Sequence, residues 1–160
     1  ALKTGFRYAM ERGFDAVISI DADGQHLPGE SPRFIAAWHE TSADLIIGSR
    51  AHLFTQMLAR RRMANRFSAA AISTASRLPI SDSQSGFRLY SKRLLTTVPI
   101  DANGFDAESE VIVRAGKLGL KVMMIPIELG FVNGITTSHY RPVADTVRIA
   151  IRVIRTWLAG

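Results

Sequence analysis

The sequence contains no cysteine, so it offers neither a disulfide framework nor a thiolate ligand for a metal ion. It also lacks any apolar run near the ~20 residues that a transmembrane helix needs. No internal repeat and no low-complexity linker divides it. What remains is a chain of 160 residues with 47% hydrophobic content, enough for one domain with a substantial core.

Acidic residues are in the minority, because twenty lysines and arginines stand against fourteen aspartates and glutamates, for a net charge of +6. This surplus, most of it arginine, suits phosphate groups, anionic lipid headgroups or nucleic acid. The sequence has no aromatic–basic interleaving of the kind that single-strand binders use, no glycine-rich phosphate loop and no Ser-His-Asp signature. Its histidines are too scattered for a zinc site. We therefore expect phosphate or lipid partners and no nucleic acid.

The most informative stretch is the hexapeptide Asp21-Ala22-Asp23-Gly24-Gln25-His26, which follows an apolar run at 16–20 that is typical of a buried strand. In open α/β sheets, ligands bind at the carboxyl ends of the strands. Hard cations such as magnesium and manganese prefer carboxylate and amide oxygens, and they also take phosphate oxygens of a substrate. The hexapeptide therefore indicates a site for a metal-bound phosphorylated substrate. A hydrated acidic turn is the alternative, because Asp and Gly are common turn formers.

The first third of the chain predicts a helix over 1–12, a strand over 15–20, a second helix from 31 to about 40 and a second strand over 44–48. Ser31 is the expected N-cap of the second helix, with proline at the first helical position. A strand, a helix and a strand in this order form a βαβ unit, so we expect two parallel strands joined by a right-handed crossover.

The middle of the chain predicts a long helix over 56–77, a polar loop over 82–86 and a short strand over 87–90. Ser91 is expected to cap a short helix that stops before Pro99. Another helix is expected to run through Lys117. A third strand then follows over 121–127, where Pro126 favours a sheet edge or the end of a strand.

The last segment, 142–159, predicts a basic amphipathic helix that begins at Pro142. One stripe of this helix is apolar and another carries arginines. It could lie on an anionic membrane surface, or it could pack on the sheet with its arginines in water. We interpret residues 1–160 as a single α/β domain.

Arg50 follows the second predicted strand, so it should lie at the same edge of the sheet as the acidic hexapeptide. Two carboxylates that hold a cation beside a guanidinium suit a diphosphate leaving group. The 82–88 segment combines hydroxyls, a glycine and Arg88, and it is a plausible anion cradle. The arginines between positions 60 and 66 favour either a solvated helix face or an anion-binding one.

These motifs, in their order and spacing, resemble the family 2 glycosyltransferases, and in particular the branch of dolichol-phosphate mannosyltransferases and bacterial polyprenyl-phosphate glycosyltransferases. The residues that carry the resemblance are Asp21-Ala22-Asp23-Gly24-Gln25-His26, Gly48-Ser49-Arg50, Asp82-Ser83-Gln84-Ser85-Gly86-Phe87-Arg88, Gly104-Phe105-Asp106-Ala107-Glu108-Ser109-Glu110 and Ser138-His139-Tyr140-Arg141-Pro142.

The resemblance implies a GT-A-like fold, which is a Rossmann-like, mostly parallel sheet flanked by helices. It also implies a nucleotide-sugar donor, either a GDP-sugar or a UDP-sugar, and a divalent metal, magnesium or manganese. By position, Asp21 would lie near the nucleotide and the sugar, while Asp23 and Gln25 would ligate the metal. Asp21, Asp23 and Arg50 would be the donor-binding and catalytic groups.

The resemblance further implies a polyprenyl or dolichyl phosphate acceptor, with an inverting transfer at the inner, cytoplasmic face of the cell membrane. The residues expected to face that acceptor phosphate are Arg62, Ser85, Arg88 and Arg141. The role of Arg62 could pass to its neighbours Arg60, Arg61 or Arg66. A lipid phosphate is already largely anionic near neutral pH, so it needs no general base. Asp106 and Glu108 are candidate bases if the acceptor is a hydroxyl.

One feature of the family is missing, namely an opening strand with a Pro-Ala-Tyr-Asn-Glu-like segment that holds the nucleotide. We therefore expect this sequence to be an N-terminally truncated part of the domain, and we expect it to bind nucleotide sugar poorly by itself. Two other functions compete with sugar transfer. One is a non-catalytic module that binds a lipid phosphate or a partner, and the other is a haloacid-dehalogenase-like phosphatase.

Overall fold

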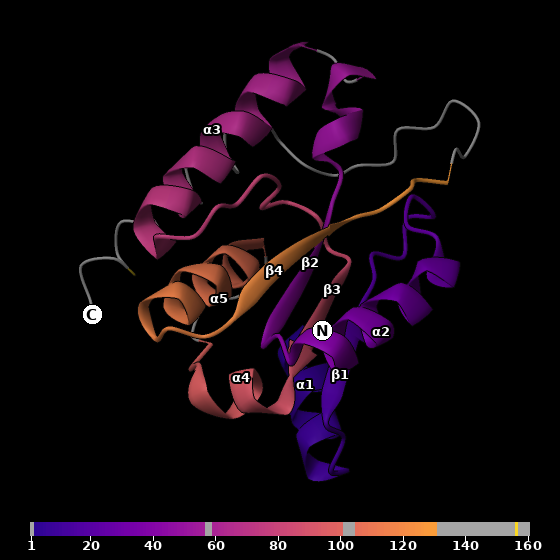
Figure 1. The fold of residues 1–160 in the computed structure, drawn as a ribbon, viewed down its shortest axis with the longest axis vertical. Helices are drawn as coiled ribbons and strands as arrows, with labels where there is room; N and C mark the ends of the chain where they lie inside the picture. The colour runs from indigo at the N-terminus through magenta and orange to yellow at the C-terminus, as the bar shows by residue number, and fades with distance from the viewer. Residues whose placement is uncertain (1, 57–58, 101–104, 131–155, 157–160) are drawn as a thin grey trace.

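The computed structural model of the chain describes residues 2–56, 59–100, 105–130 and 156 (Figure 1). The predicted helix over 142–159, apart from Thr156, lies outside the described residues, as does Arg141. No helix among the described residues is long and apolar enough to cross a membrane.

The centre of the fold is a four-stranded sheet in the order β1-β3-β2-β4. Its strands are β1 (Ala16–Ser19), β2 (Leu45–Ser49), β3 (Arg88–Ser91) and β4 (Val122–Pro126). β3 is antiparallel to both of its neighbours, whereas β2 and β4 are parallel. Three strands therefore run in one direction, and the sheet is mixed.

The predicted strands of the βαβ unit, β1 and β2, run in the same direction, but another strand lies between them. β1 and β2 run the same way, because both pair antiparallel with β3. β3 lies between them, and its register sets Ile18 and Ile46 opposite the same Leu89. Local patterning cannot reveal such an insertion, because the inserted strand lies about forty residues further along the chain than β2. The prediction for Pro126 is confirmed, since it is the last residue of β4, which pairs only with β2 among the described strands.

The helices match the predicted ones to within a few residues. They are α1 (Leu2–Glu11), α2 (Ser31–Thr41), α3 (Ala59–Ser76), α4 (Lys92–Thr97) and α5 (Phe105–Lys117), with short 3-10 segments at Pro28–Glu30 and Ala51–Gln56.

The two predicted serine caps have different outcomes. Ser91 caps α4 as predicted, because its Oγ accepts a hydrogen bond of 3.1 Å from the Leu94 amide. Ser31 is instead the first helical residue of α2, and Glu30 in the N-cap position makes no side-chain capping bond. The reason is that the 3-10 segment Pro28–Glu30 runs directly into α2, so no extended residue precedes the helix.

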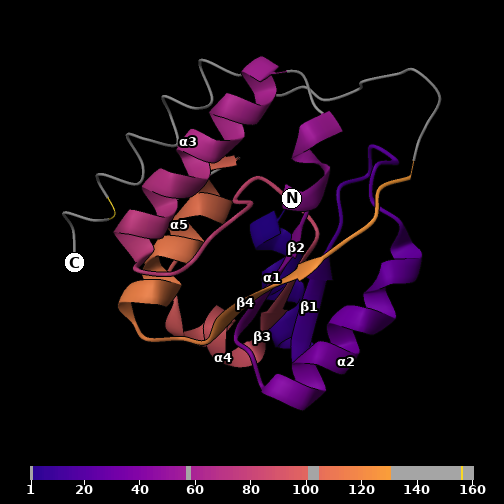
Figure 2. The same cartoon turned by 45° about the horizontal axis from the view of Figure 1, so that its top comes forward.

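Helices cover both faces of the sheet, α2 on one and α1, α4 and α5 on the other, as Figures 1 and 2 show. Alternate residues of β2 point to opposite faces. Leu45 and Ile47 belong to the larger core cluster, while Ile46 packs with Phe34 and Phe87 on the α2 side. The Phe34 and Phe87 rings stack with their centroids 4.3 Å apart. The sheet is thus the middle layer of an α/β fold, as predicted.

Candidate functional site

The acidic turn directly follows β1. The Asp23 Oδ1 accepts a hydrogen bond of 3.0 Å from the Gln25 amide, and Gly24 takes a positive φ of 79°. This closes an Asx-type turn on the surface and leaves Asp23 exposed. The side chain of Asp21 is about half exposed, at 52%. Both carboxylates are therefore open to a ligand from solvent.

The acidic turn rests directly on the loop that precedes β3. A Cβ atom at Gly86 would come within 2.3 Å of Asp21 Oδ1, so only glycine allows this contact. Ser19 Oγ donates a hydrogen bond of 2.8 Å to the Gly86 carbonyl from the end of β1. Two segments that the sequence singled out separately thus form one surface.

Arg50 lies at the end of β2 and pairs with Asp82. Its Nε and Nη2 donate to Asp82 Oδ2 and Oδ1 at 2.8 Å and 3.2 Å, and its backbone amide also donates to Oδ2 at 3.0 Å. The side chains of Arg50 and Asp82 are 12% and 0% exposed. Burial by itself would raise the pKa of Asp82, but the adjacent Arg50 guanidinium outweighs this effect and holds that pKa below its usual value.

Arg88 is fully buried, and this differs from the prediction that it faces a phosphate. Its Nε and Nη2 donate to the Ser85 and Ser83 carbonyls at 2.7 Å and 2.8 Å. Its Nη1 donates to the Glu108 carbonyl at 3.0 Å, and Nη2 also reaches Glu108 Oε2 at 3.2 Å. All three nitrogens have protein partners and the side chain is not exposed to solvent, so Arg88 ties the loop to α5.

Glu108, on the first turn of α5, keeps one edge toward solvent, with its side chain 19% exposed. Burial raises the pKa of its carboxyl, and the nearby Asp21 and Asp82 carboxylates act in the same direction, while Arg88 opposes them. A carboxyl of this kind holds its proton to a higher pH than an ordinary one. The side chain of Asp106, the other candidate base, is not among those described.

The other predicted acceptor residues are only partly located. Ser85 is fully buried, and its Oγ has no hydrogen-bond partner among the described residues. Arg62 is partly exposed on the first turns of α3, and Arg66 is exposed one turn later. The side chains of Arg60 and Arg61 are outside the description.

His26 lies beneath the acidic turn. It is 4% exposed, its ring packs against Phe87 with centroids 5.6 Å apart, and its backbone pairs with Leu129. Its Nδ1 is 3.8 Å from Asp21 Oδ2, and burial lowers the pKa of the imidazole. This placement fits a residue that supports the turn.

The oxygen atoms of the acidic turn provide only some of the ligands that a hard cation needs. Among the described residues, no group of three or more His, Cys, Asp or Glu could hold a metal ion. Asp21, Asp23 and Gln25 supply carboxylate and amide oxygens on an exposed turn. Magnesium-type sites with one or two carboxylates take their remaining ligands from water and substrate phosphates. The turn therefore fits a cation that arrives with a phosphorylated ligand.

Asp82 and Gly86 were in a segment that the sequence pointed to, but their roles were not predicted. Asp82 fixes Arg50 across 32 residues of sequence, and no local pattern reveals such a pair. The Gly86 contact with Asp21 could have been suspected, since a glycine in a polar loop often marks a close approach of two segments.

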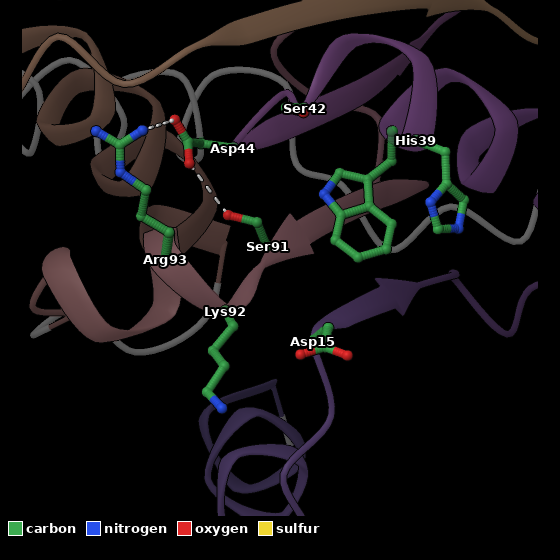
Figure 3. Close-up of a pocket in the computed structure, with 8 residues that line it drawn as sticks. Asp15, His39, Ser42, Asp44, Ser91, Lys92 and Arg93 are labelled. Carbon is green, nitrogen blue, oxygen red and sulfur yellow. Dashed lines mark hydrogen bonds and ion pairs between the residues drawn. The ribbon is translucent and has the colours of Figure 1, made fainter.

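A hollow of about 450 Å³ lies at the opposite end of the strands from the acidic turn (Figure 3). Asp15 and Asp44 stand there just before β1 and β2, beside Ser91 and Arg93. Asp44 accepts hydrogen bonds from the Lys121 amide at 2.9 Å and from Ser91 Oγ at 3.3 Å. The buried acid in this hollow is thus satisfied by structural partners.

Comparison with known proteins decides the family. The model described as "Glycosyl transferase family 2" matches residues 1–98, which is more than half of the chain. This chain belongs to glycosyl transferase family 2.

Within glycosyl transferase family 2, an undecaprenyl-phosphate mannosyltransferase of Micrococcus luteus is 31% identical over 129 residues, covering 77% of this chain and 52% of the relative. A polyprenol monophosphomannose synthase of Mycolicibacterium smegmatis is 28% identical over 137 residues, covering 79% and 50%. The chain spans about half the length of these curated relatives. The resemblance found in the sequence is confirmed.

Solved structures show the same fold. Glucosyl-3-phosphoglycerate synthase from Mycobacterium tuberculosis, in complex with Mn²⁺, UDP and phosphoglyceric acid, superposes with a TM-score of 0.63 at 19% identity, covering 98% of this chain and 52% of that one. Its complex with Mn²⁺ and UDP-glucose gives a TM-score of 0.60 at 20% identity, with the same coverage. The predicted GT-A-like fold is therefore confirmed for this family 2 member.

Proposed function

We propose that this chain is part of an inverting glycosyltransferase that moves a sugar from a GDP- or UDP-sugar to a polyprenyl or dolichyl phosphate, with a divalent cation. Family membership supports sugar transfer, and the names of the two bacterial relatives support a lipid phosphate acceptor. The similarly folded structures that hold Mn²⁺ with UDP or UDP-glucose support the metal and the donor.

The observation that carries this proposal is the close contact between the Asp21 carboxylate and Gly86. That contact brings the acidic turn next to the loop whose Asp82 orients Arg50. Exposed carboxylates and a fixed guanidinium then share one edge of the sheet, where a cation and a diphosphate need complementary charges.

The residues of the acidic turn and the Arg50–Asp82 pair would have separate roles in donor binding. Asp23 and Gln25 would hold the magnesium or manganese ion, and Asp21 would lie beside the sugar nucleotide. The bound cation would neutralise charge on the departing diphosphate. Arg50 would add positive charge at the same place, while Asp82 keeps its guanidinium in one orientation.

On the acceptor side, we assign direct phosphate contact to Arg62 and Arg141. Ser85 and Arg88 would instead shape the loop, because both are fully buried. The lipid phosphate needs no base, since its second pKa is about 6. Glu108 becomes the candidate base only if the acceptor proves to be a hydroxyl, a role that its raised pKa suits.

A polyprenyl phosphate resides in a membrane, so we place the working enzyme peripherally on the inner, cytoplasmic face. The donor would come from the cytoplasm and the acceptor phosphate from the leaflet. No nucleic acid partner is proposed.

The test is an assay of the full-length protein with polyprenyl phosphate and a panel of GDP- and UDP-sugars, with manganese, with magnesium and with EDTA. We expect metal-dependent transfer from one donor class. Phosphate release without sugar transfer would favour the phosphatase, and lipid binding without turnover would favour the non-catalytic module. Either result would overturn the proposal.

A further inference from the structure

Helix α3 has one face that is fixed against the protein. Asn65, Ser68, Ala69 and Ile72 are buried on that face. A Cβ atom at Gly116 of α5 would come within 2.2 Å of the Ser76 carbonyl, so the two helices are in close contact there. The buried inner face of α3 therefore holds the side chains of its outer face in a fixed position on the protein surface.

The outer face of α3 presents two large apolar side chains to solvent. Met63 is 71% exposed and Phe67 is 63% exposed, the two highest values for large hydrophobic residues among those described. They are one helical turn apart, so they project side by side. Ala70 is exposed one turn further along the same face. Adjacent exposed apolar groups of this size mark an interaction surface more often than isolated ones do.

All charged side chains of α3 are basic. The helix Ala59–Ser76 contains four arginines, at positions 60, 61, 62 and 66, and no aspartate or glutamate. Arg66 is exposed beside Phe67, and Arg62 is partly exposed beside Met63. Arginines that flank exposed apolar side chains are typical of helices that lie in the interface of an anionic membrane.

We propose that the outer face of α3 docks on an anionic phospholipid surface. Met63 and Phe67 enter the boundary between headgroups and acyl chains, and Arg66 contacts lipid phosphates while its aliphatic stem covers apolar surface. The occupant is a membrane because the flanking charge is uniformly basic. Two side chains are also too few for the roughly 800 Å² per partner of a stable protein interface.

The position of α3 in the fold would bring the membrane close to the proposed acceptor site. This argument rests on the proposed function. α3 follows the 3-10 segment Ala51–Gln56 that leaves β2, so its first turns lie at the same end of the sheet as Arg50 (Figure 1). Arg62 on those turns is the residue to which we assign the acceptor phosphate. A membrane held against Met63 and Phe67 would present a lipid phosphate to that end of the molecule.

The test is co-sedimentation of the full-length protein with vesicles of phosphatidylglycerol and phosphatidylcholine in equal parts. The double variant Met63→Gln/Phe67→Gln should lower the partition coefficient roughly tenfold, because it removes the apolar insertion. A matched control, Tyr8→Gln/Phe14→Gln, replaces exposed aromatic residues elsewhere and should bind as the wild type does. Raising the salt concentration should weaken wild-type binding, and vesicles of phosphatidylcholine alone should bind less protein.

Unchanged vesicle binding by the Met63→Gln/Phe67→Gln variant would overturn the proposal. So would concentration-dependent self-association that this variant abolishes without affecting vesicle binding, because α3 would then meet a second copy of the chain. Transfer to a short, water-soluble acceptor phosphate is measured in parallel and should be the same in both double variants. If transfer is absent from every protein while vesicle binding depends on Met63 and Phe67, the proposed function fails and the docking surface stands.

Discussion

The two ends of the sheet both contain acids and bases, but they hold them differently. At the amino end of β1 and β2, Asp44 accepts hydrogen bonds from a backbone amide and a serine, and the Arg93 side chain beside it is 71% exposed. At the carboxyl end, the Arg50 and Arg88 side chains are 12% and 0% exposed, and each is paired with an acid.

We interpret this difference as one between a structural end and the end at which we propose the active site. Asp44 accepts hydrogen bonds from neighbouring groups. The Arg93 guanidinium beside it remains in water, so it carries little desolvation cost. Charges buried at the carboxyl end carry a desolvation cost that stability alone does not explain. Such groups concentrate where a protein must meet a charged ligand.

The largest effect is expected from Asp82→Ala. This change leaves the buried Arg50 guanidinium without its partner, so we expect it to lower the free energy of unfolding by about 3–5 kcal/mol. Urea denaturation at neutral pH measures it. Because the pKa of Asp82 is lowered in the folded state, its contribution is present above about pH 4 and is lost as the pH falls through the folded-state value.

The matched change at the other end is Asp44→Ala. It removes an acceptor from the Lys121 amide and from Ser91 Oγ, and we expect a smaller loss of about 1–3 kcal/mol. Equal losses for Asp82→Ala and Asp44→Ala would mean that the two ends do not differ in the way we describe.

An intermediate effect is expected from Gly86→Ala. The added methyl group would overlap the Asp21 carboxylate and displace it from the loop, at about 1 kcal/mol in unfolding free energy, because this half-exposed side chain can shift. Gly5→Ala is the control, since a Cβ atom there meets nothing within 4 Å and alanine favours a helix by about 0.5–1 kcal/mol. A Gly86→Ala protein as stable as the wild type would show that this contact does not constrain the turn.

The smallest effect is a pH dependence that originates from Glu108. Its pKa is raised in the folded state, so the folded protein holds this proton at a pH where the unfolded chain has released it. Stability should therefore fall as the pH rises from about 4.5 through the folded-state pKa, and Glu108→Gln should remove that slope. The check is a series of denaturation curves for both proteins across this range. If the free energy of unfolding of the wild type rose with pH relative to that of Glu108→Gln, the raised pKa of Glu108 would be contradicted.

Much of the fold was predictable because the periodicities are local. Apolar runs gave β2 and β4, Ser91 gave the start of α4, and the order of motifs gave the family. Neither the insertion of β3 between β1 and β2 nor the loss of the Ser31 cap could be predicted. Strand adjacency depends on contacts distant in sequence, and the Ser31 cap fails because a 3-10 segment directly precedes α2.

The residues that come together in the candidate site were predictable in part, but the orientation of their side chains was not. Asp21 and Arg50 lie at one edge of the sheet as expected, because β1 and β2 both end there, and the loop that leads into the antiparallel β3 joins them at that edge. Arg88 was expected to face a ligand, yet it points inward to Ser83, Ser85 and Glu108. Sequence composition identifies a guanidinium but not the side of the loop on which it lies.

Metal-dependent sugar transfer by full-length Asp23→Ala and Asp15→Ala proteins most directly tests whether the carboxyl end of the sheet is the active one. Both variants remove an exposed aspartate that flanks β1, one from each end. We predict that Asp23→Ala lowers transfer by about a hundredfold or more, because it removes the carboxylate that we propose as a ligand of the cation, and that Asp15→Ala stays near wild type. Metal-dependent transfer that survives Asp23→Ala would contradict the placement of the active site at the acidic turn.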